Sequence, residues 1–210
     1  VIVNSDGTVS AVGLTSVSQA IGSPAVFESA DTTFTSSTFD SNSNKVVIAY
    51  SDGGNSSYGT AVVGTVSGTS ISFGTPVVYE SGATYYIVCT FDSNLNKVVI
   101  AYRDSDNSSY GTAVVGTVSG TAISFGTPVV FESASVSSKG ITFDSNLNKV
   151  VIAYSDAGNS GYGTAIVGTV SGTSISFGSP VVFASADTQN VSTTFDSASN
   201  KVVIAYRDVG

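Results

Sequence analysis

The chain has no histidine, no tryptophan and no methionine, and it has a single cysteine, Cys89. The lack of histidine removes the commonest general base and the commonest transition-metal ligand. The lack of tryptophan removes the ring that most often stacks on sugars. One cysteine excludes an internal disulfide. Because Cys89 lies in the apolar stretch 85–89, we expect it to be a small buried core residue.

Charged residues are also scarce, at 10% of the chain, and the net charge is −8. This acidic balance argues against nucleic acid and anionic membranes as partners. No run of 18 apolar residues is present, so no membrane insertion is expected, and no N-terminal signal peptide is visible. The start at Val1 and the lack of methionine suggest a processed protein or a piece of a longer one. Whether a leader sequence has been removed is left open.

What the chain does have is a 52-residue unit that occurs four times. Apolar residues make up 41% of the whole chain and are ordered into runs, so the chain is not of disordered composition. The prolines, four phenylalanines and four lysines recur in register: Pro24, Pro76, Pro128 and Pro180; Phe39, Phe91, Phe143 and Phe195; Lys45, Lys97, Lys149 and Lys201. A fixed period of this size is the mark of a repeat architecture.

Each unit reads as four short strands separated by polar turns, with no helix-period segment. In the second unit the first strand ends at Asp92, and the later strands are expected at 97–102, 112–118 and 122–127. The run 97–102 is unbroken and apolar, as in a strand buried on both faces, whereas 122–127 alternates like an outer strand. In the turn after Asp92 we expect that carboxylate to cap the turn, with a weak ion pair to Lys97.

Four strands per unit predict an all-β fold, a four-bladed β-propeller of 52-residue repeats, with a β-solenoid as the main rival. The last blade is expected to take two strands from each terminus, which leaves no unpaired sheet edge. The length of the chain, about four units of 52 residues, also fits a piece of a longer array or strand exchange between copies. The single domain 1–210 would then have blades at about 30–81, 82–133, 134–185, and 186–210 plus 1–29.

The repeats separate scaffold from candidate site. Among the aromatic residues only Phe34, Tyr85 and Tyr86 break register, and among the lysines only Lys139 does. All four fall in one window, which lies between the last strand of one unit and the first of the next. In a propeller this connection rims the channel, so the window predicts ligand-binding loops at the channel mouth. Gln189 and Asn190 occupy the same window in the last unit. Unconstrained loops are the alternative.

A second asymmetry concerns the two arginines, which follow the recurring tyrosine only in the second and fourth units, as Arg103 and Arg207. Across a four-bladed ring they could clamp an acidic group. The plainer expectation is that each pairs with a neighbouring carboxylate. The start of a calcium-loop pattern at Asp104 and Asp106 is not shared by the other units, so no metal and no cofactor are predicted.

Two resemblances bear on function. The segment 50–58 is similar to the Asp-box turn of sialidase-type propellers, but their catalysis needs an arginine triad, and this chain has two arginines. The unit Phe-Asp-Ser-Asn-x-Asn-Lys-Val-Val-Ile-Ala-Tyr-x-Asp, followed by Tyr-Gly-Thr-Ala-Val-Val-Gly-Thr-Val-Ser-Gly, resembles repeats of tail-fibre-like and surface proteins of marine bacteriophages and bacteria. That resemblance covers nearly the whole chain. It implies an extracellular or virion-surface location and a role in adhesion or receptor recognition.

Three functional hypotheses follow. The first is a non-enzymatic module that binds a cell-surface glycan or polymer through the channel-mouth loops, with Phe34, Tyr85 and Tyr86 as flat apolar contacts. Polar contacts would come from Arg103, Arg207, Lys139, Gln189 and Asn190. The alternative is a structural or assembly domain of a virion or surface fibre, with other fibre proteins or a second copy as partner. An enzyme is disfavoured, although a carboxylate pair such as Asp31 and Asp187 could in principle serve a glycosidase.

Overall fold

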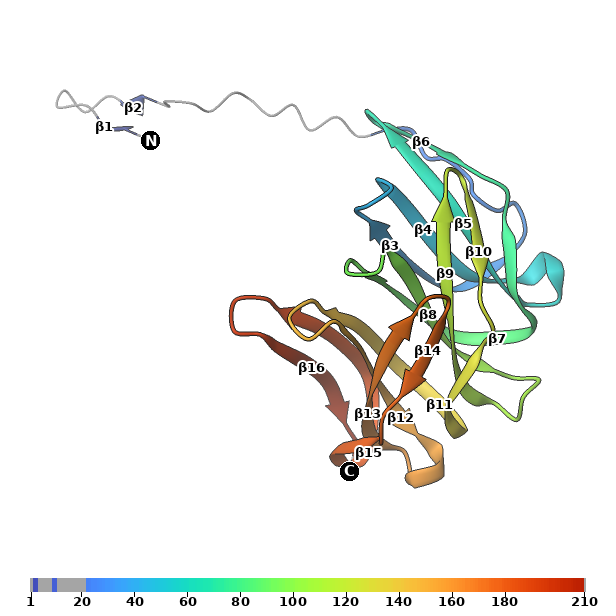
Figure 1. The fold of residues 1–210 in the computed structure, drawn as a ribbon, viewed down its shortest axis with the longest axis vertical. Coiled ribbons are helices and arrows are strands. Elements are labelled where there is room, and N and C mark those ends of the chain that lie inside the picture. The colour runs from blue at the N-terminus through green and yellow to red at the C-terminus, as the bar shows by residue number, and fades with distance from the viewer. Residues whose placement is uncertain (1, 4–8, 11–21, 210) are drawn as a thin grey trace.

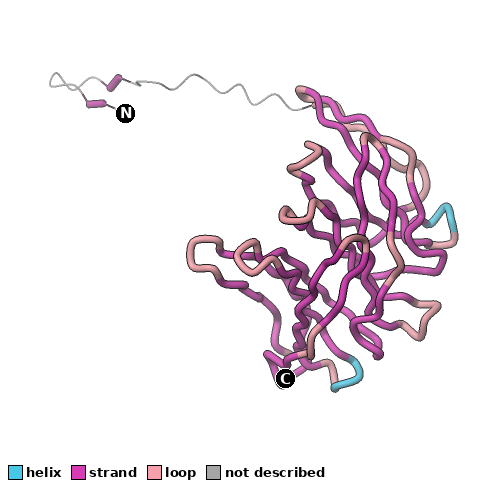
Figure 2. Tube along the Cα trace, in the orientation of Figure 1, coloured by secondary structure: helices cyan, strands magenta, loops and turns pink. Residues whose placement is uncertain are grey.

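The structure is a computed structural model that describes residues 2–3, 9–10 and 22–209. These residues form an all-β protein, as predicted, and two short 3-10 turns at Gly53–Asn55 and Ala157–Asn159 are the exceptions within them (Figure 2). None of the described residues belongs to a helix with the length and apolar character needed to cross a membrane.

The strands recur in the same order in each unit (Figure 1). The first unit contains β3 (Thr32–Asp40), β4 (Lys45–Asp52), β5 (Tyr58–Ser67) and β6 (Ser70–Phe73). The second contains β7 (Val77–Asp92), β8 (Lys97–Asp104), β9 (Tyr110–Ser119) and β10 (Ala122–Phe125). The third contains β11 (Val129–Asp144), β12 (Lys149–Asp156), β13 (Tyr162–Ser171) and β14 (Ser174–Phe177). The last contains β15 (Val181–Asp196) and β16 (Lys201–Asp208), while β1 (Ile2–Val3) and β2 (Val9–Ser10) pair with each other.

Neighbouring units are joined through long shared strands. The first part of β7 pairs with β5 of the first unit, and its second part pairs with β8 of the second unit. The strands β11 and β15 repeat this arrangement. As a result, the described residues contain one antiparallel sheet of 14 strands, which runs from β3 to β16. The connections expected between units as loops are therefore continuous strands.

The sheet does not close on itself in the described residues, because β3 and β16 stand at its two ends (Figure 1). The expected closing segment 1–29 lies partly outside those residues, at 1, 4–8 and 11–21. In its described part, Val9 pairs with Val3 rather than with β16. A closed ring of four blades is thus not seen, and the edge of β16 that faces away from β15 has no partner strand among the described residues.

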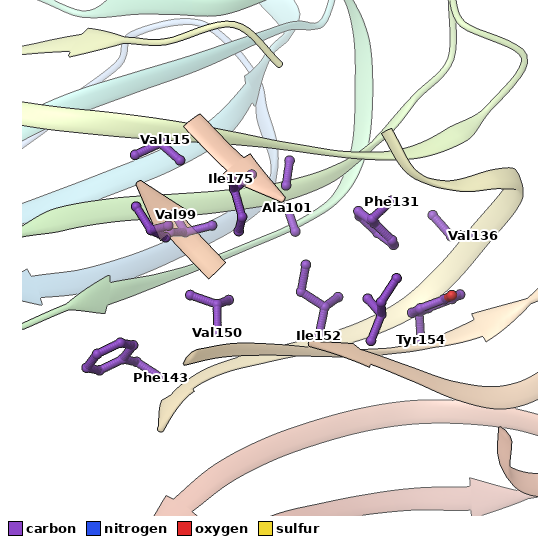
Figure 3. Packing of buried hydrophobic residues seen from close by; sticks show 13 residues of the cluster. Val99, Ala101, Val115, Phe131, Val136, Phe143, Val150, Ile152, Tyr154 and Ile175 are labelled. Atoms are coloured by element: carbon purple, nitrogen blue, oxygen red, sulfur yellow. The ribbon is translucent and has the colours of Figure 1, made fainter. Parts of the chain in front are cut away.

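Two apolar cores lie between successive units. One of them joins the second unit to the third, with Val99, Ala101 and Val115 above Val150 and Ile152 in Figure 3. The other joins the first unit to the second and includes Cys89, which is 8% exposed, as predicted. Burial raises the pKa of the Cys89 thiol to about 11, so it stays protonated at neutral pH. The cores hold successive blades face to face.

The recurring tyrosine anchors each complete four-stranded unit. Tyr154 is fully buried, its ring packs edge-on against Phe131 at 5.3 Å, and its hydroxyl donates to Glu132 at 2.9 Å. Burial, together with the negative charge of Glu132, raises the pKa of this hydroxyl far above its ordinary value. Tyr206 holds the same place on β16 but is 41% exposed. The last blade therefore lacks the cover that the others have.

The tight turn after the first strand is capped as predicted. Asp92 accepts hydrogen bonds from the backbone N–H groups of Asn94 (2.9 Å) and Leu95 (3.0 Å), and Asn96 takes a left-handed conformation with φ 55°. The expected ion pair with Lys97 is wrong for this turn, because Lys97 Nζ donates to the Thr117 hydroxyl at 2.9 Å instead. The turn is held by one carboxylate and two amides.

Candidate functional site

A β-bulge interrupts the inner strand of every unit at the window singled out by the sequence. In β7, for example, the register steps from Tyr85 opposite Arg103 to Val88 opposite Ala101, so that Tyr86 and Ile87 face one partner residue. The same step occurs in β3, β11 and β15. A bulge bends its strand and re-aims the side chains around it. The prediction of channel-mouth loops is therefore wrong in its geometry: the varied residues lie on bulged strands.

The first of the two bulge residues has a left-handed backbone conformation in β3, β7 and β15. Phe34, Tyr86 and Asn190 have φ values of 51°, 50° and 53°. Asparagine tolerates this region, but an aromatic residue there carries strain of the order of 1–2 kcal/mol. Such strain persists where the surroundings fix it, and it is common at binding sites. The bulges of β3 and β7 therefore hold aromatic rings at a structural cost.

The three irregular aromatic residues come together. The ring of Phe34 lies 5.5 Å from that of Tyr85, nearly edge-on at 76°, and 5.3 Å from that of Tyr86. Phe34 is 39% exposed, and both tyrosines are partly buried. These centroid distances are those of favourable aromatic pairs. The grouping of the three residues, expected from their shared window, is thus present across β3 and β7.

Arg103 lies over both tyrosines. Its guanidinium carbon is 4.8 Å from the ring centre of Tyr85 and 4.8 Å from that of Tyr86, within the range of cation–π attraction. Its Nε is buried and has no hydrogen-bond partner. Among the described residues no carboxylate pairs with this arginine, so the expected ion pair is wrong here. The tyrosine faces are its neighbours because Tyr85 stands directly opposite Arg103 on the adjacent strand.

Lys139 is the least expected member of the site. It is the second bulge residue of β11, a place filled by Ile87 in the unit before it and by Val191 in the unit after it. Its side chain is only 6% exposed, and its Nζ has no hydrogen-bond partner. Nζ lies 5.9 Å from the ring centre of Tyr86. Burial, with a smaller contribution from the charge of Arg103, holds the pKa of Lys139 well below its ordinary value.

Lys139 lines two adjoining cavities. The first has a volume of about 190 Å³ and is floored by Ser36, Cys89 and Ser192. The second, of about 260 Å³, is lined by Tyr86, Ile87, Val88, Lys139, Asn190 and Val191. Reasoning from broken register missed the apolar lining, Ile87, Val88 and Val191. These residues lie in the same variable window. The alternation of inward and outward side chains along the strand on either side of the bulge is the signal that could have identified them as lining residues.

The remaining predicted residues form a separate group. Arg207 donates from its guanidinium to the Gln189 side-chain oxygen at 3.3 Å, on the exposed last blade. Of the two predicted residues on β15, Gln189 and Asn190, only Asn190 shares a cavity with Tyr86 and Lys139. The predicted site therefore divides into a cluster of Phe34, Tyr85, Tyr86, Arg103 and Lys139, with Asn190 beside it, and a pair on β15 and β16. From here on we call the first group, with Asn190, the bulge cluster.

Other chemistry is not evident in the described part of the chain. No group of three or more Asp, Glu or Cys side chains there is placed to hold a metal ion. Asp31 and Asp187 are both exposed and belong to different units. No protein-family model matches the chain, and no curated protein matches it either.

Proposed function

We propose that this domain is a non-enzymatic recognition module that binds a glycan or surface polymer across the bulge cluster. The observation that carries the proposal is a group of three aromatic rings that do not recur between units, with Arg103 over two of them and Lys139 near one, on an otherwise uniform scaffold. Flat rings with polar groups at their edges suit sugar rings, which have an apolar face and polar rims. A place on a phage tail fibre or another extracellular surface agrees with the resemblance of the repeat.

Replacing both Tyr85 and Tyr86 by alanine is expected to abolish binding to the host surface or to a glycan array. The two rings are two of the three aromatic side chains of the cluster, and truncating anchor residues of this kind costs about 2 kcal/mol or more, about a 30-fold loss of affinity. Binding is measured on the intact chain, and circular dichroism shows whether the variant is folded.

The matched control is Phe39→Ala, which removes an aromatic side chain that is 54% exposed but belongs to the repeat frame. This variant is expected to bind like the parent chain. Unchanged binding by the folded double variant would contradict the placement of the site.

A structural or assembly role is the second candidate, and one observation favours it. Apolar side chains at the open end of the sheet are exposed, among them Val181 (64%), Val203 (50%) and Val182 (43%). A partner that covers them, from this chain or from a second copy, would remove the exposed patch. A stable homo-oligomer together with no binding to any surface would favour this role over recognition.

We also propose that the four units close into a four-bladed propeller in which the N-terminal segment completes the last blade. Support comes from residues 22–28, whose contacts with the first unit repeat those that the corresponding residues make with later units. Phe27 packs on Tyr50 at 5.2 Å, as Phe131 packs on Tyr154 in the third unit. A side chain at Gly22 would collide with the carbonyl of Thr69, as one at Gly74 would with Thr121.

Closure predicts slow hydrogen exchange at the amides of β16 that face away from β15, comparable with the protection of β12. A third strand would take up these donors, whereas a bare edge exchanges close to the rate of an unstructured chain. Exchange followed by NMR or mass spectrometry measures this, with the molar mass recorded to separate closure within one chain from strand exchange. Fast exchange along β16 would contradict the closed ring.

A further inference from the structure

Two cationic side chains of the bulge cluster have buried nitrogen atoms without a hydrogen-bond partner. They are Lys139 Nζ and Arg103 Nε. A buried polar group without a partner costs free energy, and a buried charge costs more, so such groups are normally paired. The chain has 15 acidic residues against 7 basic ones, yet none of the residues that line the two cavities is acidic. Among the residues that the structure describes, these positive groups thus have no counter-charge.

The neighbouring units show that the fold does not need a cation there. Ile87 and Val191 fill the place of Lys139 in adjacent blades and are 4% and 7% exposed. An apolar residue would therefore fit, and a lysine at this position is a departure from the scaffold. A ligand that supplies the missing negative charge to the cavity accounts for the lysine.

The surroundings of Lys139 limit what that ligand can be. The larger cavity, about 260 Å³, is small for a binding pocket and has apolar walls at Ile87 and Val191. It has room for one ring-sized unit rather than for a folded segment. At its edge stand the Tyr86 ring and Asn190, which offer a flat face and an amide. Arg103 does not line either cavity, but its guanidinium lies over the Tyr86 ring, 4.8 Å from the ring centre, and adds positive charge nearby.

We propose that this cavity binds the carboxylate of an acidic sugar residue, with Lys139 as its counter-ion and the Tyr86 ring against the sugar face. The inference rests on the proposed recognition function and names the ligand class for the same site. The carboxylate would bring Lys139 Nζ the hydrogen-bond acceptor that it lacks. A neutral sugar would leave Lys139 unpaired and would bind weakly.

The test compares the same sugar in a charged and in a neutral form. Calorimetric titration of the full chain compares a trimer of galacturonic acid with its methyl ester, in which each carboxylate is neutralised. The acid is expected to bind about 10- to 100-fold more tightly, the range for one hydrogen bond to a charged group. Monomeric galacturonic acid and an oligoglutamate peptide, run in parallel, separate a sugar site from a general anion site.

Variants locate the effect. Lys139→Met and Lys139→Gln are each expected to reduce the difference between acid and ester to less than threefold. Lys201→Met, which removes one exposed positive charge from β16, is expected to leave it unchanged and controls for the net charge of the protein. Having two substitutions at Lys139 keeps the test valid if one of them fails to fold.

Several outcomes would overturn the proposal: equal binding of acid and ester, unchanged preference in the Lys139 variants, tighter binding of the peptide than of the sugar, or no binding of any probe. One result would contradict the acidic-sugar proposal but not the recognition function. In that result the neutral ester binds, its binding is lost in the Tyr85/Tyr86 double alanine variant, and Lys139→Met leaves its binding unchanged. The domain would then be a recognition module whose ligand is not acidic.

Discussion

Lys139→Met is expected to stabilise the ligand-free domain by about 1–3 kcal/mol at neutral pH, an unusual direction for a core substitution. Lysine and methionine have similar length, and the place is apolar in the adjacent units, so methionine keeps the packing while removing a buried cation. Thermal or denaturant unfolding of both proteins measures the difference. A binding group that lowers stability in the free protein is typical of functional sites.

The stabilisation by Lys139→Met should depend on pH in a defined way. Burial, and then the charge of Arg103, lowers the pKa of Lys139 in the folded protein. Below this lowered pKa the lysine is charged in both states, and the native state carries the full cost of the buried charge. Between the lowered pKa and about 10.4, the unfolded chain holds a proton that the native state lacks, so parental stability rises with pH. The advantage of methionine should shrink through that window.

The neighbours of Lys139 do not reverse this sign. The Tyr86 ring lies against Nζ through its face, with 5.9 Å between Nζ and the ring centre. The Cys89 thiol, which lines the same cavity, has a pKa raised to about 11 and is neutral across the window. A Lys139→Met variant that is less stable than the parent at pH 7 would mean that Nζ has a partner in solution, and the anion site would lose its main support.

The second large effect is expected at the anchoring tyrosines. Tyr154→Ala should lower the free energy of unfolding by about 3–5 kcal/mol, because the ring is fully buried and removing it leaves a cavity. It also leaves Glu132 without the hydroxyl that donates to it at 2.9 Å. Denaturant unfolding followed by circular dichroism gives the loss.

Tyr206→Ala is the matched comparison, since Tyr206 holds the same frame position. If the N-terminal segment completes the last blade, as we propose, Tyr206 becomes covered and its loss should cost nearly as much as that of Tyr154. With the exposure of 41% seen on the open sheet, the cost would be about 1 kcal/mol. A small effect at Tyr206 beside a large one at Tyr154 would therefore show that the last blade stays open.

The sequence predicted the regular part of the fold well because the repeat encodes it locally. The strand 97–102 was expected from an unbroken apolar run, and β8 begins at Lys97 as predicted. The turn before it follows from Asp92 and Asn96, whose side chains and backbone preferences act within a few residues. Closure could not be predicted in the same way, because it depends on contacts between the two ends of the chain.

The candidate site was found by its broken register but misjudged in its geometry. Nothing in the preferences of Phe34 or Tyr86 indicates a left-handed bulge residue, since aromatic side chains disfavour that region. Lys139 was expected to lie at an exposed rim, as lysines usually do. Its burial follows from the bulge in β11, which turns the second bulge residue inward as it does Ile87. Tertiary packing, rather than local preference, determines both the left-handed bulge residues and the burial of Lys139.

The strands β7, β11 and β15 each belong to two blades, and this has a mechanical consequence. A blade cannot detach without breaking a strand that also holds its neighbour, so the units should unfold together rather than one at a time. A pull along the chain would be distributed over several hydrogen-bonded ladders at once. Adding or removing a whole 52-residue unit would leave the strand pairing at every junction the same, so arrays of different length could arise by duplication without redesign of that pairing.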